Sequence, residues 1–263
     1  MKLYDKNISE IQEMVESFSC RKYKDTLSSP FHFQSDKSNQ KAIRENAANL
    51  EWPTAEDDNL ILRHEMAYEL GGADCYAVSA MGFTSQESLV SRDEIIQIGP
   101  DLPQIKNDTA YARLVFVKVA DDFFKDSNAA YSTMRQIEYT RYHVSPKGYM
   151  MRISTANNRE AVRVGKDALL EGLDFQKVGK IFSQAYHEHS QVQAVKIVFI
   201  TAPEFPYAEL QKHAIQMEQI TESLNHILKD LKMDCSICNL KPVCDEVEGM
   251  RELHFGANGK QKA

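Results

Sequence analysis

Val195-Lys-Ile-Val-Phe-Ile200 is an almost uninterrupted apolar run, and Pro203 follows it shortly afterwards. β-branched and aromatic side chains in a run of this length, ended by a proline, are typical of a buried strand. Tyr111-Ala-Arg-Leu-Val-Phe-Val-Lys-Val119 has the same character, and shorter runs lie at residues 76–83 and 95–98. Together these runs predict a sheet in the middle of the chain.

Helical segments flank the predicted strands. Residues 127–142 and 165–189 have helical character, and residues 207–232 place apolar side chains on one helical face. We interpret this stripe as core packing; its members are Leu210, Ala214, Met217, Ile220, Leu224, Ile227, Leu228 and Leu231. The pattern predicts an α/β (α+β) fold, with a mixed sheet and flanking helices.

The amino-terminal part of the chain is predicted to be a helical, loop-rich arm. Asn7 is an N-cap candidate, because Glu10 follows three residues later and apolar residues then recur at helical spacing. Residues 28–59 are polar and contain two prolines, so we expect a loop there with at most a short helix at residues 41–50. The predicted division of the chain is an arm at residues 1–65, an α/β domain at residues 66–232 and a cysteine-rich tail at residues 233–263.

Composition and charge limit the class of protein. Of the 263 residues, 43% are hydrophobic, which is enough to build a core. The first residues lack the pattern of a signal peptide, and no apolar stretch reaches the roughly 18 residues of a membrane span, so we expect a cytoplasmic protein. The formal net charge of -7 argues against nonspecific binding to nucleic acid or to an anionic membrane.

One stretch of this negatively charged chain carries an excess of basic residues. Seven basic residues lie between Arg135 and Lys166, against two acidic ones, Glu138 and Glu160. Because arginine pairs with phosphate bidentately, the stretch is a candidate seat for a phosphate-bearing ligand or an acidic partner. The alternative is a solvated basic face without a ligand. The basic residues are Arg135, Arg141, Lys147, Arg152, Arg159, Arg163 and Lys166.

A cysteine cluster near the carboxyl end points to a metal. Cys235-Ser-Ile-Cys238-Asn-Leu-Lys-Pro-Val-Cys244 is followed by His254, which gives the series C-x2-C-x5-C-x9-H. Thiols and imidazole are the ligand types of structural zinc and of iron–sulfur centres. The pattern predicts a small metal-binding cap that holds a 4Fe-4S cluster or, alternatively, zinc. The expected ligands are Cys235, Cys238, Cys244 and His254, with Asp245 or Glu248 as alternatives for the fourth position.

Other reactive residues carry weaker signals. Cys20 and Cys75 are isolated, as small core residues usually are, and we assign neither a catalytic role. His187 and His189 stand two positions apart, a spacing that points helical side chains in different directions. GxSxG, P-loop, GxGxxG and HExxH motifs are absent from the sequence, so hydrolase, NTPase and dinucleotide-binding functions lack support.

Several central segments, taken in order, resemble the middle domain of the acetyl-CoA synthase subunit of the carbon monoxide dehydrogenase/acetyl-CoA synthase complex. Their order and spacing fit that family apart from small insertions around Lys147 and Ser154. The matching segments are Tyr68-Glu-Leu-Gly-Gly72, Ile98-Gly-Pro-Asp-Leu102, Leu114-Val-Phe-Val-Lys-Val-Ala120, Arg135-Gln-Ile-Glu-Tyr139, Arg159-Glu160, Arg163-Val-Gly-Lys-Asp-Ala168 and the run to Thr201.

The resemblance implies a ligand for the basic stretch. In that family the middle domain is an α/β module that meets coenzyme A through arginines, and Arg159 and Arg163 fall on the family's arginine positions. The resemblance therefore implies coenzyme A as a ligand; the candidate binding residues are Arg135, Arg141, Arg152, Arg159, Arg163 and Lys166.

The resemblance also bears on the cysteine cluster and on catalysis. In the family, the middle domain is followed by a cysteine motif similar to C-x2-C-x8-C-x9-C. In this sequence the three cysteines and His254 correspond to its four ligands, with a shorter loop between the second and third cysteines. The Cys-Gly-Cys that binds the catalytic nickel in the family does not occur in this sequence. The resemblance thus implies a relative without acetyl-CoA-forming nickel chemistry.

These expectations favour an accessory or binding protein of anaerobic one-carbon metabolism, acting beside a CO dehydrogenase or a corrinoid protein. One alternative is a redox or acyl-transfer enzyme subunit that works with such a partner. Another is a zinc-capped structural protein or a sensor of redox state or CO. Bound iron with a reversible redox change favours the enzyme alternative, whereas zinc removes electron transfer.

Overall fold

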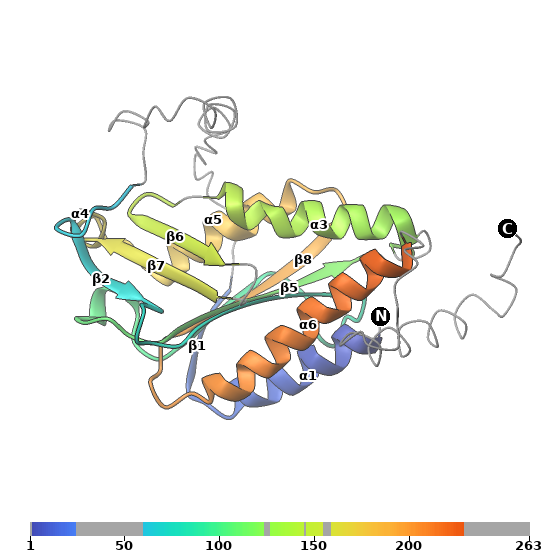
Figure 1. Cartoon of the computed structure of the whole chain (residues 1–263), viewed down its shortest axis with the longest axis horizontal. Coiled ribbons are helices and arrows are strands. Elements are labelled where there is room, and N and C mark those ends of the chain that lie inside the picture. The colour runs from blue at the N-terminus through green and yellow to red at the C-terminus, as the bar shows by residue number, and fades with distance from the viewer. Residues whose placement is uncertain (1, 25–59, 124–126, 145, 155–158, 229–263) are drawn as a thin grey trace, which may run out of the picture.

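The computed structural model describes residues 2–24, 60–123, 127–144, 146–154 and 159–228. This part of the chain forms two β-sheets, and helices cover both faces of the larger one (Figure 1). The predicted mixed α/β architecture with flanking helices is confirmed. The expected short helix at residues 41–50 and the cysteine-rich tail lie outside the described residues.

The larger sheet has the strand order β1-β4-β8-β5-β3. The pairs β1–β4 and β5–β8 are antiparallel, whereas β4–β8 and β3–β5 are parallel, so the sheet is mixed. The apolar run at residues 195–200 lies in β8, the middle strand, where both faces are covered and continuous apolar character is expected. The bounds are Cys20–Lys24 for β1, Ala77–Thr84 for β3, Glu94–Ile98 for β4, Tyr111–Val119 for β5 and Val192–Ile200 for β8.

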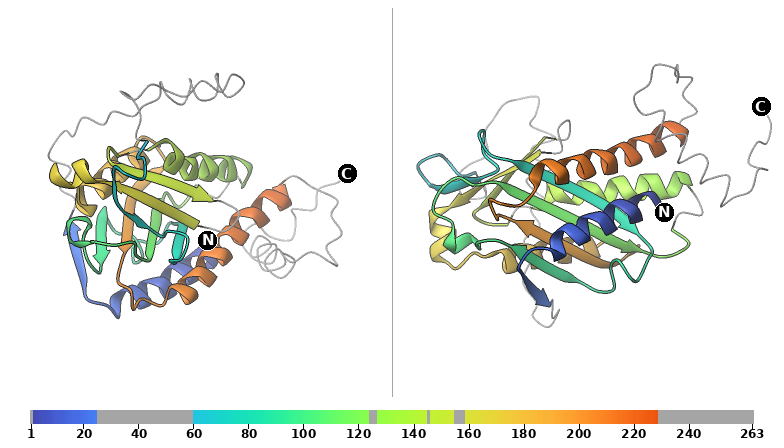
Figure 2. Two further views of the ribbon diagram at one scale, coloured as in Figure 1. Left: turned by 60° about the vertical axis from the view of Figure 1, so that its left-hand side comes forward. Right: turned by 90° about the horizontal axis from the view of Figure 1, so that it is seen from below.

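One face of this sheet is covered by helices from the two ends of the described chain. α1 (Lys2–Glu16) and α6 (Tyr207–Leu228) lie side by side across it (Figure 2). Gly82 of β3 lies beneath both helices, because a Cβ built there would stand 2.3 Å from Met217 Cε and 3.2 Å from Ile8 Cδ1. The predicted stripe on α6 is confirmed as core packing at the members whose side chains the structure describes, which are Leu210, Ala214, Met217 and Ile220.

The opposite face carries α5 and the smaller sheet. Gly179 of α5 packs against Ile95 of β4, and Phe175 stacks on Phe199 of β8 with ring centroids 4.6 Å apart. The smaller sheet is antiparallel throughout, in the order β2-β7-β6. The bounds of these and the remaining elements are Met66–Leu70 for β2, Tyr149–Ser154 for β6, Arg159–Gly165 for β7, Leu102–Gln104 for the one-turn 3-10 helix η1, Ser127–His143 for α3, Lys166–Leu170 for α4 and Phe175–His187 for α5.

Two helix boundaries differ from the predicted ones. The first helix begins at Lys2, so the N-cap interpretation of Asn7 is wrong; Asn7 lies within α1, its Oδ1 3.1 Å from His213 Nδ1 on α6. The helical segment predicted at residues 165–189 is two helices. Gly172 has a φ of +83°, which ends α4, and the Asp174 side chain then caps α5 by accepting from the Lys177 N–H at 2.7 Å.

Four strands were not anticipated from the sequence: β1, β2, β6 and β7. β1 is a short edge strand with Arg21, Lys22 and Lys24, and charged side chains of this kind are usual on a sheet edge. Together with α1 it places the beginning of the chain on the larger sheet. None of the described helices is both long and apolar enough to cross a membrane.

Candidate functional site

The six basic residues predicted to meet a ligand fall on four different elements, so they are close in the sequence but not all close in space. Arg152, Arg159 and Arg163 lie on the smaller sheet, Arg135 and Arg141 lie on α3, and Lys166 begins α4. Lys166 Nζ donates to the backbone carbonyl of His64 at 2.8 Å. Only the three sheet arginines share one surface.

Strand alternation puts these three arginines on one face of the smaller sheet. Arg159 and Arg163 flank Ala161 on that face of β7, and Ala161 is paired with Arg152 on β6. Glu69 on β2 is paired with Arg163 in register and forms ion pairs with Arg152 and with Arg163, the latter with 3.6 Å between Oε1 and Nε. We call Glu69, Arg152, Arg159 and Arg163 the arginine face. Three guanidinium groups and one carboxylate give it a net positive charge.

Arg159 also lines an open depression of about 500 Å³. This volume falls in the range of small-molecule sites. The depression lies between the segment that follows β2 and the amino-terminal end of α6. We call it the Arg159 depression; its other lining residues are Ala73, Asp74, Cys75, Tyr76, Ala77 and Gln211.

Backbone carbonyls hold Arg159 in place. Its Nη2 donates to the carbonyls of Gly71 at 3.0 Å and Cys75 at 3.3 Å, and also to that of Gly72. The turn itself requires glycine at position 71, because φ is +61° and a Cβ there would stand 2.5 Å from Ala77 Cβ. The guanidinium plane at the depression is therefore fixed by the turn after β2.

Cys75 is the thiol of the Arg159 depression. Burial raises its pKa, and the negative charges of Asp108 and Asp74 raise it further. Because the thiolate is the nucleophilic form, the raised pKa lowers the nucleophilicity of this thiol at neutral pH. The Arg159 depression is therefore suited to binding rather than to covalent chemistry at Cys75.

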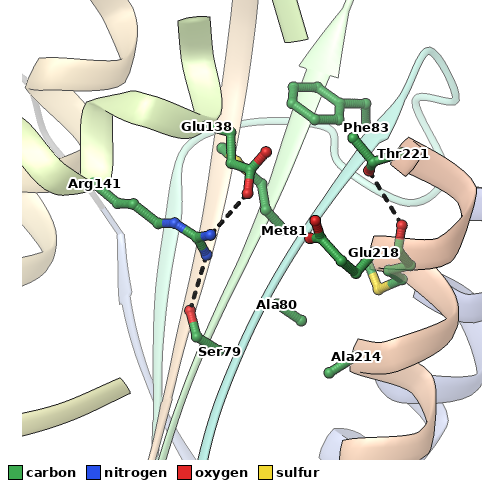
Figure 3. Close-up of a pocket in the computed structure, with 10 residues that line it drawn as sticks. Ser79, Ala80, Met81, Phe83, Glu138, Arg141, Ala214, Glu218 and Thr221 are labelled. Carbon is green, nitrogen blue, oxygen red and sulfur yellow. Dashed lines mark hydrogen bonds and ion pairs between the residues drawn. The ribbon is translucent and has the colours of Figure 1, made fainter. Parts of the chain in front are cut away.

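The two arginines of α3 are held by carboxylates where α3 meets β3 and α6. Arg141 is buried, donating from Nη2 to Glu138 Oε1 at 2.7 Å and from Nη1 to Ser79 Oγ at 3.3 Å, and Figure 3 shows it pointing toward both. Arg135 Nη1 lies 2.6 Å from Glu138 Oε2 and 3.6 Å from Glu218 Oε1. We call Arg135, Glu138, Arg141 and Glu218 the α3–α6 seam.

The cavity at the α3–α6 seam has a volume of about 10 Å³. Arg141, Glu138, Glu218 and Thr221 are among its lining residues (Figure 3). This is room for about one water molecule, so the cavity is too small for a phosphate-bearing ligand. Within the described residues, the seam is a structural charge network rather than a ligand pocket.

A buried ion pair joins the two sheets, and sequence reasoning missed it. Arg113 Nη2 lies 2.6 Å from Glu160 Oε2, with side chains 1% and 0% exposed. Ser79 Oγ donates to the same carboxylate oxygen at 3.3 Å, and the Arg113 guanidinium carbon lies 4.1 Å from the centre of the Phe182 ring. In the sequence, Glu160 stands out only as a negative charge within the basic stretch. The available signal was Arg113 itself, a charged residue inside an apolar strand.

The predicted metal ligands, Cys235, Cys238, Cys244 and His254, lie outside the described residues. Within the described part of the chain, no group of three histidine, cysteine, aspartate or glutamate side chains could hold a metal ion. His187 and His189 contact different residues, but the helical spacing argument does not apply to them, because α5 ends at His187 and His189 lies beyond it. His187 Nε2 lies 2.8 Å from Asp93 Oδ2, whereas His189 Nε2 lies 2.7 Å from Thr140 Oγ1.

Comparison with known proteins identifies the family of the chain. No curated protein matches the chain. Residues 50–205 match the family described as the CO dehydrogenase/acetyl-CoA synthase complex beta subunit, and this range is more than half of the 263 residues. The match includes the arginine face and the segment after β2 that forms most of the Arg159 depression. The chain therefore belongs to the family of the CO dehydrogenase/acetyl-CoA synthase complex beta subunit.

Proposed function

We propose that the chain is a coenzyme-A-binding accessory module of one-carbon metabolism, which acts beside a CO dehydrogenase or a corrinoid protein. The family match supports the metabolic setting and a CO dehydrogenase as partner. The observation that carries the ligand is the arginine face beside the Arg159 depression, a positively charged surface next to a space of ligand size. No Cys-Gly-Cys occurs in the sequence, so we propose binding rather than nickel chemistry for these residues.

The charges narrow the proposed coenzyme A site to three of the six predicted residues. Coenzyme A carries a 3′-phosphate and a pyrophosphate, and guanidinium groups bind such oxygens bidentately. Arg135 and Arg141 already pair with Glu138 at the α3–α6 seam, and the adjoining cavity is too small for a ligand. The phosphates therefore belong with the arginine face; the proposed contacts are Arg152, Arg159 and Arg163.

Isothermal titration of the full chain with coenzyme A tests the ligand. We expect the wild type to bind and Arg159→Gln to bind about tenfold more weakly or worse, because a charge-assisted hydrogen bond is lost. Arg152→Gln is a second variant, since Arg159 also supports the turn after β2. Thermal unfolding of each variant reports whether the fold is intact.

Lys147→Gln is the matched control for this titration. Lys147 belongs to the same basic stretch of sequence, but it is exposed, pairs with Glu171 at 3.3 Å and is not a member of the arginine face. We expect this variant to bind coenzyme A as the wild type does. Absence of heat with the wild type, or an equal loss in Lys147→Gln and Arg159→Gln, would contradict the proposed site.

The second part of the proposed function is a metal centre in the cysteine-rich tail. Its support is the C-x2-C-x5-C-x9-H spacing, which offers the ligand types of a 4Fe-4S cluster or of structural zinc. An iron–sulfur cluster would supply electron transfer, and zinc would supply folding free energy to the tail. The proposed ligands are Cys235, Cys238, Cys244 and His254.

Anaerobic purification with elemental analysis and an absorption spectrum tests this centre. Cys238→Ser should lower the metal content, because one thiolate ligand is removed, whereas Cys20→Ser on β1 should leave it unchanged. Iron with a reversible redox change would favour the redox or acyl-transfer subunit, and zinc would favour a structural cap. Unchanged metal content in Cys238→Ser would contradict the proposed ligand set.

A further inference from the structure

The small cavity at the α3–α6 seam lies between three elements. Ser79 of β3, Arg141 of α3 and Glu218 of α6 are among the residues that line it, and Figure 3 shows Glu218 projecting from α6 toward the side chains of α3. The cavity volume of about 10 Å³ is close to the least space that an internal water molecule needs. The cavity therefore has room for one small guest.

Arg141, which lines this cavity, has one N–H group without a partner. Its Nη2 donates to Glu138 Oε1 at 2.7 Å and to the Tyr142 hydroxyl at 3.1 Å, and its Nη1 donates to Ser79 Oγ at 3.3 Å. Its Nε is buried, and among the described residues no atom accepts from it. A buried donor without an acceptor costs free energy, so an acceptor that the chain itself does not supply is expected beside Nε.

Glu218 supplies acceptor oxygens to the same cavity. Arg135 Nη1 lies 3.6 Å from Glu218 Oε1, which is beyond the ordinary length of a hydrogen bond. A carboxylate has about four lone-pair sites, so this ion pair leaves most of the acceptor capacity of Glu218 available. The cavity thus has a donor in need of an acceptor on α3 and an acceptor on α6.

The charges of the seam favour a neutral guest. The four side chains that define the seam are two arginines, Arg135 and Arg141, and two glutamates, Glu138 and Glu218. Because these charges balance, an added ion would be buried without a counter-charge, which is costly. Water is neutral, and it both accepts and donates hydrogen bonds, whereas chloride cannot donate and a sodium ion cannot accept.

We infer that the seam cavity holds one internal water molecule, which accepts from Arg141 Nε and donates to the Glu218 carboxyl group. The water completes the hydrogen bonds of the buried guanidinium group and links α3 to α6. This site shares no residue with the arginine face or with the Arg159 depression. The inference therefore stands whether or not coenzyme A binds.

A high-resolution crystal structure of the full chain tests the site directly. We expect an electron-density peak within about 3.2 Å of Arg141 Nε and of a Glu218 carboxyl oxygen. Crystals soaked in bromide identify an anion, because bromide scatters anomalously and water does not. An empty cavity, a bromide ion in it, or a water molecule that contacts only one of the two side chains would overturn the inference.

An isosteric pair of substitutions at Ala214 gives a second readout. Ala214 lines the cavity from α6 and is 1% exposed. Valine and threonine add similar volumes and would both displace the water, but only threonine brings a hydroxyl group that can accept from Arg141 Nε. We expect the wild type to be at least as stable as Ala214→Thr. The thermal midpoint of Ala214→Thr should lie about 2–4 °C above that of Ala214→Val.

The same pair at Ala185 is the matched control. Ala185 is 4% exposed on α5 and belongs to the hydrophobic core, but it does not line the seam cavity. A buried hydroxyl group gains nothing in an apolar site, so Ala185→Val should be more stable than Ala185→Thr. If threonine exceeds valine at both positions, or if Ala214→Thr is more stable than the wild type, the seam cavity holds no water and the inference fails.

Discussion

Arg113 and Glu160 place two opposite charges in the core, and each depends on the other. Their side chains are 1% and 0% exposed, with 2.6 Å between Nη2 and Oε2. Glu160→Gln would leave the Arg113 guanidinium buried without its counter-charge. We expect this variant to lose about 3–5 kcal/mol of unfolding free energy, measured by urea denaturation at neutral pH.

The double variant Arg113→Met with Glu160→Gln is the control for this pair. With both charges removed, no uncompensated ion remains in the core, so the double variant should be more stable than Glu160→Gln alone. If Glu160→Gln loses less than about 1 kcal/mol of unfolding free energy, solvent must reach the ion pair. That result would contradict the burial of both side chains.

Single residues also show why the charge network could not be read from the sequence. Glu160 adjoins Arg159, yet strand alternation turns Glu160 into the core and Arg159 to the opposite face. Arg113, the partner of Glu160, is 47 positions away in the sequence. The charged residues of β7 mask its alternation of buried and exposed positions, so the sequence alone does not show which face of the strand carries Arg159 and which carries Glu160.

At the scale of elements, the α3–α6 seam carries a pH-dependent contribution to stability. Burial raises the pKa of Glu218 above its ordinary value of 4.5, and the nearby Glu138 raises it further, against the opposing charges of Arg135 and Arg141. A raised pKa means that the folded state binds the proton more tightly than the unfolded state. Stability contributed by protonated Glu218 is therefore lost as the pH rises through its folded pKa.

Glu218→Gln should show this effect. The amide cannot ionise, so the variant should gain stability relative to the wild type as the pH rises from 4 to 8, measured by urea unfolding at several pH values. Glu209→Gln on the same helix is the control with the opposite sign. Lys212 holds the pKa of the exposed Glu209 below its ordinary value of 4.5, so this variant should lose relative stability as the pH rises through that value and should change little at higher pH. Parallel trends in the two variants would contradict the assignment.

The elements that the sequence predicts correctly are those in which apolar residues recur at regular spacing without interruption. β5, β8 and α6 were recognised because long buried runs and a helical stripe leave little ambiguity. The smaller sheet was missed because it alternates charged with buried residues over short spans, and its basic residues were interpreted only as a charge run. The sequence therefore predicts only part of the candidate site. It indicates Arg159, but it does not indicate Tyr76 and Gln211, because these residues come together only where the fold brings α6 beside the turn after β2.

At the scale of the whole molecule, the beginning of the chain is part of the core. Four side chains of α1 are fully or almost fully buried: Tyr4, Ile8, Ile11 and Val15. Burying each contributes about 1.5–3 kcal/mol, a sum comparable to the total stability of about 5–15 kcal/mol of an ordinary domain. The buried cluster that joins the layers extends in sequence from Tyr4 to Ile220 within the described residues.

Two truncated chains test how the molecule is divided. A chain of residues 25–263 should lose cooperative urea unfolding and bind a hydrophobic dye, because α1 and β1 no longer cover and complete the larger sheet. A chain of residues 1–228 keeps the whole described core and should unfold cooperatively with a midpoint close to that of the full chain. It should also contain no metal, because the four proposed ligands are removed. Cooperative unfolding of the chain of residues 25–263 would contradict a core that includes α1. Metal retained by the chain of residues 1–228 would contradict a metal centre confined to the tail.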